Sequence, residues 1–355
     1  MLKKWISSLQ LARDIWRRKL GIWLFDRQGV AFKPDGVLKR VVLVRWDAKW
    51  GDSIVSSFIF REWRRSYPDI RLDVITTPNM SALFRKYFSA DHVYEIRKRP
   101  SYGELNQLAA ELGEMDLLVH LSNALKMKDI FFMSRVKSRA IAGLDEQVGL
   151  VNLTLGRSGR GKHFSEKFRL LLERTGADIE STSYIVPDDI EAQRKVDVFL
   201  ASLDKPLLVF NPYGSGQSRQ LNQEKIGEIL GVLLRQREDI HVVILTTPEK
   251  KGEVENICHG HERVFYYPDT KSIYDSIAIM RRADWVISVD TATVHIAVGL
   301  GKKLLAFYNP DDENFAEWGP NDNDTLVLFS SPHVPPDMNR LSQEHYTPLL
   351  RQLLR

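Results

Sequence analysis

The sequence has little of several features that mark particular classes of protein. Its single cysteine, Cys258, cannot form a disulfide within the chain or a thiolate metal cluster, which favours a reducing compartment. The uncharged apolar stretches, such as 20–25 and 285–289, are far shorter than the roughly 20 residues that a membrane-spanning helix needs. Charged residues between positions 13 and 19 interrupt the N-terminal segment before a signal-peptide core develops. We therefore expect a cytoplasmic protein.

The chain also lacks a large excess of charge of one sign. Its 355 residues include 50 Lys and Arg against 46 Asp and Glu, which gives a formal net charge of +4. So small a surplus gives no reason to expect a nucleic-acid partner. A hydrophobic content of 43% with 27% charged residues excludes a disordered or fibrous chain. Since a domain usually takes roughly 100–200 residues, the length predicts two domains.

Short β-branched runs alternate with helical stretches in two successive sets. Eight segments are predicted to be strands: 40–46, 72–76, 117–121, 140–143, 207–210, 241–245, 285–289 and 303–308. Helices are expected at 53–67, 223–237, 272–283 and 292–300. The pattern predicts an α/β protein of two facing, doubly wound Rossmann-like domains with an interdomain cleft.

The expected domain boundaries follow from this alternation. A basic amphipathic helix occupies 1–30, the two Rossmann-like domains take 31–186 and 187–335, and a C-terminal helix takes 336–355. The segment 184–189 carries the proline and acids typical of a linker, so we expect the hinge there.

In doubly wound sheets, ligands bind beyond the carboxyl ends of the strands. The first loop of interest, 47–53, contains Gly51, which permits close backbone approach, and Asp52 at the mouth of a helix. Asp52 suits either a functional carboxylate or an ordinary helix N-cap.

Two further loops offer groups for an anionic ligand. The loop 211–219 has two glycines around a serine and then an arginine, a set that suits a diphosphate, although a plain Gly-Ser turn is the alternative. It is neither a Walker loop nor a GxGxxG fingerprint, and the absence of that fingerprint after 41–46 argues against a nicotinamide-dependent dehydrogenase. In 288–295, Asp290 and two threonines end a buried strand. Asp290 could again be a cap and His295 a core histidine.

These three loops occur in the order found in a known family. From about Val41 to about Pro320, the chain resembles the ADP-heptose:lipopolysaccharide heptosyltransferases, glycosyltransferase family nine. The motifs that carry the resemblance are 45–52, 289–297, 299–309 and 318–320. The chain departs from the family with Arg219 in place of the usual Lys, Leu221-Asn222 in place of Trp-Pro, and Ala292 in place of Gly.

The resemblance implies a glycosyltransferase B-type fold with an N-terminal acceptor domain and a C-terminal nucleotide-sugar domain. It implies inverting transfer of heptose from ADP-heptose to a lipid-linked core oligosaccharide of lipopolysaccharide or lipooligosaccharide. Asp52 matches the proposed base, and Lys49 and Gly51 lie on the acceptor side. The donor-binding residues would be Asn211, Gly214, Ser215, Gly216, Arg219, Asp290, Thr291, Ala292 and His295. A different nucleotide sugar, or a non-catalytic sugar-nucleotide binding protein, remains an alternative.

No Asp-x-Asp metal motif lies at a strand end, so we expect no essential cofactor, with a divalent cation able to stimulate the reaction. The acidic run 311–313 could hold such an ion, but we expect a solvated loop.

The first 28 residues form a cationic amphipathic pattern. Six apolar residues recur at three- and four-residue steps: Trp5, Leu9, Ala12, Trp16, Leu20 and Trp23. Basic residues surround them, which suits contact with the inner leaflet of an anionic membrane. Packing of this helix on the N-terminal sheet is the open alternative.

Overall fold

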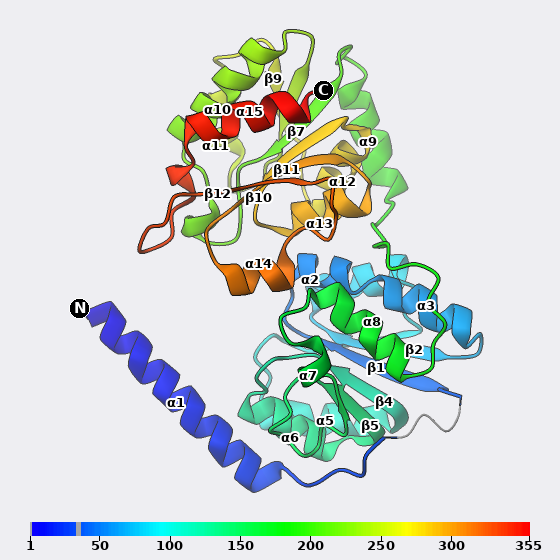
Figure 1. Cartoon of the computed structure of the whole chain (residues 1–355). Helices are drawn as coiled ribbons and strands as arrows, with labels where there is room; N and C mark the ends of the chain where they lie inside the picture. Colours follow the sequence, from blue (N-terminus) through cyan, green and yellow to red (C-terminus); the bar gives the residue numbers. More distant parts are fainter. Residues whose placement is uncertain (1, 33–36) are drawn as a thin grey trace. The chain divides into compact units, whose positions relative to one another are not determined.

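The computed structural model describes residues 2–32 and 37–355, and these form two six-stranded parallel sheets (Figure 1). The contacts divide the chain into two units. The first unit comprises the residues up to 48 together with 56–182, and the second comprises 49–55 and 183–355. The described residues include no helix long and apolar enough to cross a membrane.

The first sheet has the order β3-β2-β1-β4-β5-β6. Its strands are β1 (Arg40–Arg45), β2 (Arg71–Thr76), β3 (His92–Glu95), β4 (Glu114–His120), β5 (Lys137–Gly143) and β6 (Leu153–Thr154). The helices of this unit are α1 (Leu2–Phe25), α3 (Phe58–Ser66), α4 (Pro78–Ala82), α5 (Tyr102–Leu112), α6 (Met127–Arg135), α7 (Gly156–Gly159) and α8 (Phe164–Arg174), with a π-helical turn at Leu83–Tyr87.

The second sheet repeats the same winding in the order β12-β11-β10-β7-β8-β9. Its strands are β7 (Leu207–Asn211), β8 (His241–Ile244), β9 (Val264–Phe265), β10 (Trp285–Val289), β11 (Lys303–Tyr308) and β12 (Leu326–Phe329). Its helices are α2 (Trp50–Val55), α9 (Ile190–Leu200), α10 (Gln223–Gln236), α11 (Lys251–Cys258), α12 (Ile273–Arg282), α13 (Ala292–Gly299), α14 (Asp312–Trp318) and α15 (Gln343–Leu353), with 3₁₀ turns at Gln217–Arg219 and Met338–Arg340.

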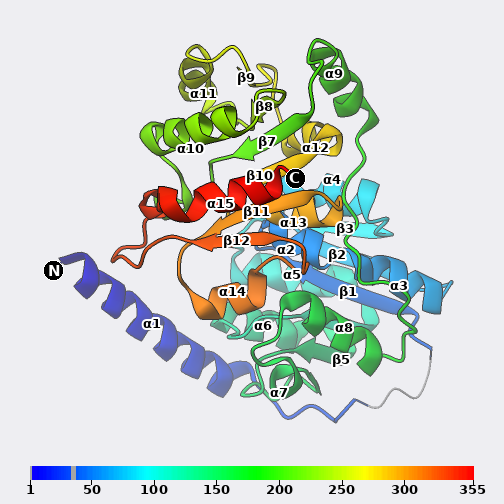
Figure 2. The same ribbon diagram turned by 45° about the horizontal axis from the view of Figure 1, so that its top comes forward.

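The C-terminal residues belong to the core of the second unit. Tyr346 and Leu350 of α15 are fully buried in the cluster that also contains Leu305 of β11. Figure 2 shows α15 lying beside β11 and β12, with α10 as its neighbour. The predicted C-terminal helix therefore completes the second domain.

The predicted fold class and the eight predicted strands are confirmed. The four strands that we did not predict are β3, β6, β9 and β12, which are the four edge strands of the two sheets. Their lengths of 4, 2, 2 and 4 residues leave no long apolar run to recognise. The helix predicted at 53–67 is divided into α2 and α3 at Ser56 and Ser57, whose carbonyls accept hydrogen bonds from the N–H groups three residues ahead, at Ile59 and Phe60.

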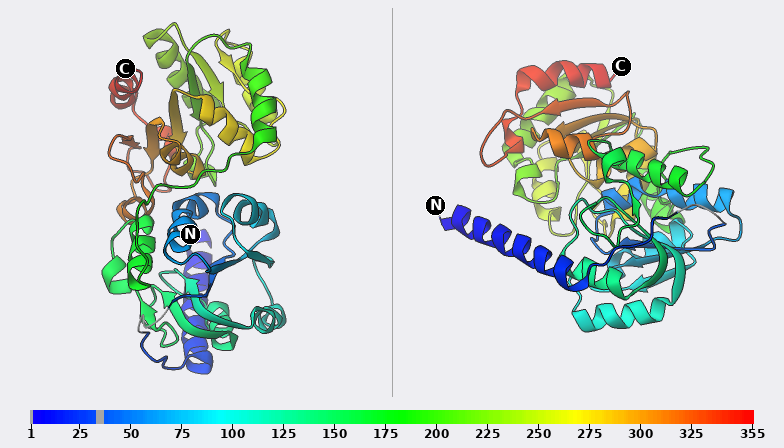
Figure 3. Two further views of the ribbon diagram at one scale, coloured as in Figure 1. Left: turned by 90° about the vertical axis from the view of Figure 1, so that its right-hand side faces the viewer. Right: turned by 60° about the horizontal axis from the view of Figure 1, so that its bottom comes forward.

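Helix α1 packs on the first unit with one face of its C-terminal portion. Ile22 and Phe25 lie against the core cluster of the first sheet, and the Phe25 and Phe131 rings are 5.1 Å apart. Figure 3 shows α1 joined to this unit at its C-terminal end, where it contacts α6. Trp16 and Trp23 are 63% and 78% exposed, so they are not core residues. The side chain of Trp5 lies outside the described residues.

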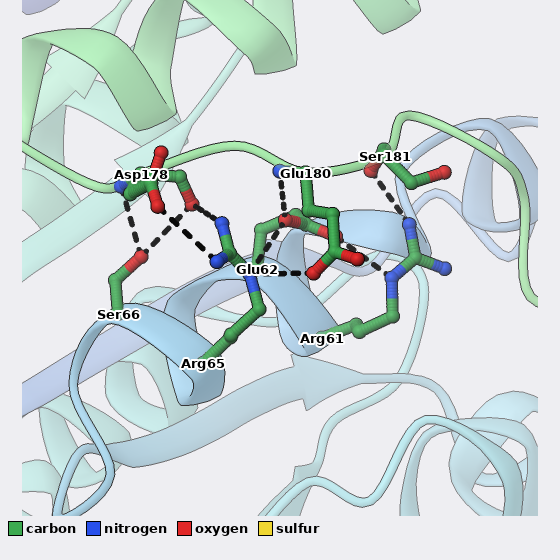
Figure 4. A network of polar contacts seen from close by, with 7 residues as sticks. All are labelled: Arg61, Glu62, Arg65, Ser66, Asp178, Glu180 and Ser181. Carbon is green, nitrogen blue, oxygen red and sulfur yellow. Dashed lines mark hydrogen bonds and ion pairs between the residues drawn. The ribbon is translucent and has the colours of Figure 1, made fainter.

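A buried carboxylate holds the last segment of the first unit in place. Glu62 on α3 is fully buried, and its Oε2 accepts a hydrogen bond of 2.8 Å from the backbone N–H of Glu180 (Figure 4). Arg61 donates to Oε1 of Glu62 at 2.7 Å and to the carbonyl of Ser181 at 2.6 Å. Burial alone would raise the pKa of Glu62, but the Glu180 amide and then Arg61 hold it below its ordinary value of 4.5. This network attaches residues 178–181 to α3.

The predicted linker 184–189 is also more ordered than its composition suggests. Tyr184 is buried in the second unit, where a Cβ on Gly299 would lie 3.2 Å from the Cβ of Tyr184. The units divide between Thr182 and Ser183, a few residues before the expected boundary at 186–187.

We predict that Glu62→Gln lowers the free energy of unfolding by about 1–3 kcal/mol, because it weakens the charged hydrogen bonds that this buried carboxylate accepts. The folded-state pKa of Glu62 is lowered, so its stabilisation is complete above pH 4.5 and is lost as the pH falls toward the folded-state pKa. The difference between wild type and variant should therefore shrink in acid. Urea unfolding at several pH values measures it. Glu166→Gln, at a 38% exposed glutamate paired with Arg169, should change stability by less than about 0.5 kcal/mol. Equal effects of the two substitutions would contradict this role of Glu62.

Candidate functional site

The candidate site lies at the carboxyl ends of β7 and β10, where the winding of the second sheet reverses direction. The loop after β7 begins with Asn211, which is buried. Its Nδ2 donates to Oγ1 of Thr293 at 2.7 Å, and its Oδ1 accepts from the backbone N–H of Tyr213 at 3.2 Å. Asn211 therefore ties this loop to the start of α13.

The two glycines of this loop have different structural roles. A Cβ on Gly214 would lie 2.6 Å from the carbonyl oxygen of Arg219 and 3.1 Å from that of Asp290, so only glycine fits there. The N–H of Gly214 donates to the Arg219 carbonyl at 3.1 Å, which means that this amide closes the loop itself. Gly216 has a φ of +86° and is exposed together with Ser215. The loop thus presents Ser215 and Gly216, and not the amide of Gly214, to a ligand.

Asp290 follows β10 and forms an ion pair with the arginine of the neighbouring loop. Its Oδ2 lies 3.1 Å from Nη1 of Arg219, and the side chains are 12% and 36% exposed, respectively. Helix α13 begins at Ala292 with Thr291 as its N-cap residue, so Asp290 is not the cap that we considered as the alternative. Two residues predicted separately from two loops are therefore partners in the structure.

The remaining predicted loop, 47–53, joins the candidate site through α2. A Cβ on Gly51 would lie 3.0 Å from Cδ2 of His295 and 3.4 Å from Cα of Ala292. The backbone of α2 therefore lies directly against α13, and residues 49–55 group with the second unit although they follow a strand of the first sheet. His295 is 5% exposed and contributes to this packing.

Asp52 lies in the first turn of α2, two residues after the helix begins, and is not its N-cap. Its carboxylate lies 3.5 Å from Nζ of Lys49 and is 16% exposed, whereas the Lys49 side chain is 63% exposed. The Lys49 ammonium also lies 6.0 Å from the ring centroid of Trp318. Asp52 is thus sheltered but keeps partial access to solvent.

Two further carboxylates act on the buried Asp290. Burial raises the pKa of Asp290; the Arg219 guanidinium opposes the increase, whereas the carboxylates of Asp311 and Asp52 add to it. Asp311 is the N-cap of α14 and accepts from the N–H of Asn314 at 3.0 Å, which gives the acidic run a structural role.

Sequence reasoning gave no site role to Tyr308 or Trp318, although both fall within motifs that carried the family resemblance. Tyr308 is the last residue of β11; burial raises its pKa, and the nearby Asp290 carboxylate adds to the increase. Trp318 ends α14, with its ring centroid 6.0 Å from the Lys49 ammonium. The signal that could have identified Tyr308 is its position at the carboxyl end of the strand next to β10. Among the described residues, no group of three or more His, Cys, Asp or Glu side chains is arranged to hold a metal ion.

Comparison with known proteins shows which family this chain belongs to. Residues 106–346 match the family model described as glycosyltransferase family 9 (heptosyltransferase). The chain belongs to this glycosyltransferase family. It is also 22% identical over 314 residues to "Putative lipopolysaccharide heptosyltransferase 4" of Escherichia coli K12, covering 85% of this chain and 84% of that protein.

Solved structures of the family share the fold. A family 9 glycosyl transferase from Veillonella parvula has a TM-score of 0.69 at 15% identity, covering 91% of this chain and 99% of that one. The E. coli heptosyltransferase WaaC with ADP has a TM-score of 0.66 at 17% identity, covering 88% and 99%. The protein is thus a glycosyltransferase with the two-domain fold of the heptosyltransferases.

The contact between α2 and α13 generates a prediction for Gly51. We expect Gly51→Ala to lower turnover at least about tenfold, because its methyl group would push Asp52 away from α13 and small displacements of a reacting group reduce rates strongly. Gly103→Ala is the matched control, since Gly103 is also the second residue of a helix but has only Ser101 Oγ nearby, at 3.9 Å. The control should keep turnover and stabilise the fold by up to about 1 kcal/mol. Steady-state kinetics measures the turnover of both variants, and thermal melting measures their stability. Normal turnover in Gly51→Ala would show that the close contact between α2 and α13 is dispensable.

Proposed function

We propose that this protein is an inverting glycosyltransferase that transfers heptose from ADP-heptose to the inner core oligosaccharide of lipopolysaccharide or lipooligosaccharide. The observation that carries the proposal is the packing of α2, which bears Asp52, against the first turn of α13, the helix that follows the Arg219-paired Asp290. Family membership and the similarity to an E. coli protein named as a putative lipopolysaccharide heptosyltransferase support it.

The reaction needs a base and a stabilised leaving group. An acceptor hydroxyl oxygen attacks the anomeric carbon of the donor while the bond from that carbon to the diphosphate oxygen breaks. The bonding electron pair leaves with ADP, and the hydroxyl proton passes to a carboxylate oxygen of Asp52. A single displacement of this kind inverts the anomeric configuration.

The diphosphate would bind where positive charge is already fixed. Arg219 provides a planar guanidinium whose position is set by Asp290, and Ser215 and Gly216 are exposed on the same loop. The N-terminus of α13, opened by Thr291 and Ala292, directs its amides toward the same edge. Such preorganised groups stabilise the charge that develops on the leaving diphosphate. Asn211, Gly214 and His295 would support this site by shaping its loops.

The acceptor side of the proposal rests on Lys49, which directly precedes α2 and pairs with Asp52, and on Gly51, next to Asp52 in the first turn of α2. We propose a lipid-linked acceptor, a cytoplasmic location at the inner face of the membrane, and contact with that membrane through residues 1–28. We also propose that no cofactor is essential, since Arg219 can neutralise leaving-group charge, and that a divalent cation can add to this effect.

We predict that Asp52→Asn lowers turnover by about 10²-fold or more, because the amide keeps the shape of the side chain but cannot accept the proton. The affinity for ADP and the melting temperature should change little. Release of ADP from ADP-heptose in the presence of truncated lipopolysaccharide measures turnover. Asp312→Asn, at an exposed acid in the first turn of α14, is the matched control and should retain full activity. Near-normal turnover in Asp52→Asn would exclude Asp52 as the base.

We predict that Arg219→Ala weakens ADP binding by about 1.5–3 kcal/mol, the usual effect of losing a charged hydrogen bond. Isothermal titration calorimetry with ADP measures this without requiring an acceptor. Arg282→Ala breaks another ion pair of the second unit, the 2.8 Å contact with Asp197, and should leave ADP affinity unchanged. Equal affinity in wild type and Arg219→Ala would remove the diphosphate from this loop. Titration of GDP- and UDP-sugars against ADP-heptose tests the identity of the donor.

A further inference from the structure

Helix α1 exposes a straight apolar stripe that no described residue of the first unit covers. Leu9, Trp16 and Trp23 are 53%, 63% and 78% exposed. Because an α-helix has 3.6 residues per turn, residues seven apart lie on almost the same line along its surface. These three side chains, which we call the tryptophan stripe, therefore form one continuous face of α1.

In the C-terminal portion of α1, from Arg18 onward, the opposite face is fixed to the first unit. Arg18 donates to both carboxylate oxygens of Asp145 at 2.8 Å, and a Cβ on Gly21 would lie 2.9 Å from Cα of Met127 at the start of α6. Arg18 follows Trp16 by two residues, a rotation of about 200° around the helix. The same rotation separates Phe25, which packs on Phe131, from Trp23. Docking of one face therefore holds the tryptophan stripe outward.

The charges beside the stripe indicate what it contacts. Arg13 and Lys19 lie about 60° to either side of Trp16, and both are exposed together with Arg17 and Arg27. The one acid of α1, Asp14, is paired with Arg13 at 3.2 Å. Tryptophan favours the interface between lipid and water, and flanking cations are attracted to anionic headgroups. If the stripe instead contacted the same stripe of a second copy of the chain, the cations of the two copies would lie close together and repel each other.

We propose that the tryptophan stripe lies in the interfacial layer of an anionic lipid bilayer, with the Arg18–Asp145 side of α1 holding the first unit above it. The proposal deepens the proposed transfer to a lipid-linked acceptor, although its own support is the geometry and charge of α1. Deletion of residues 1–28 is a poor test, since it would also remove Ile22 and Phe25 from the core.

The test compares the full chain with Trp16→Gln/Trp23→Gln in sedimentation with vesicles of phosphatidylcholine containing phosphatidylglycerol. Wild type should bind these vesicles at low salt, bind less as salt increases, and bind vesicles of phosphatidylcholine alone more weakly. The double variant should bind at least tenfold more weakly with an unchanged melting temperature, because both side chains are exposed. Ile190→Gln/Val198→Gln is the matched control: these residues are 64% and 79% exposed on α9, and their replacement should leave binding unchanged.

Three results would overturn the proposal: no binding of wild type to anionic vesicles at low salt, equal binding by the double variant, or a wild-type dimer that this variant converts to a monomer. Trp16→Gln alone provides a second variant, since Trp16 lies farther from the docked end of α1. Transfer to a deacylated, water-soluble acceptor separates the two proposals. The double variant should transfer heptose to this soluble acceptor as fast as wild type. If wild type itself shows no transfer to it, the proposed transferase function is wrong, whatever the result with vesicles.

Discussion

The close approach of α2 to α13 at Gly51 is the contact on which the candidate site depends. A Cβ at this position would lie 3.0 Å from the buried His295 ring, so a larger residue would force the ring or one of the helices to shift. This contact brings Asp52, from a loop that follows the first sheet, close enough for its charge to act on Asp290 at the end of β10. The placement of Asp52 in the candidate site therefore follows from the packing of α2 at Gly51.

Electrostatic repulsion is built into the same region. Asp290 is buried beside Arg219 but also near two other carboxylates, and its pKa is raised as a result. A folded protein keeps such an arrangement at the expense of stability, and active sites are where this usually occurs. By contrast, Glu62 is buried with several donors, the Glu180 amide and Arg61 first among them, that lower its pKa, so it stabilises the first unit. The pKa values of these two buried acids are therefore shifted in opposite directions, because the Asp290 carboxylate has other carboxylates near it and the Glu62 carboxylate has hydrogen-bond donors.

The interior of each sheet was predictable from the sequence, whereas its edges were not. Strands such as β1 and β10 are buried on both faces, so they read as continuous apolar runs. Edge strands such as β6 and β9 have two residues each, too few to show a strand pattern, and are recognised only by their pairing with a neighbouring strand.

The candidate site was predictable from the sequence only in part, for a similar reason. Residue types and spacing identified Arg219 and Asp290 separately, but their pairing depends on β7 and β10 being neighbours, which only the topology determines.

The two faces of α1 show why a hydrophobic pattern alone could not choose between packing and membrane contact. Apolar residues recur around much of the helix, and the sequence period is equally compatible with either partner. Two residues outside the hydrophobic pattern determine which face of α1 docks on the first unit. Arg18 pairs with the buried Asp145, and Gly21 lets α1 approach Met127 closely. Once these fix the rotation of the helix, Ile22 and Phe25 are directed to the core, and Trp16 and Trp23 are directed away from it.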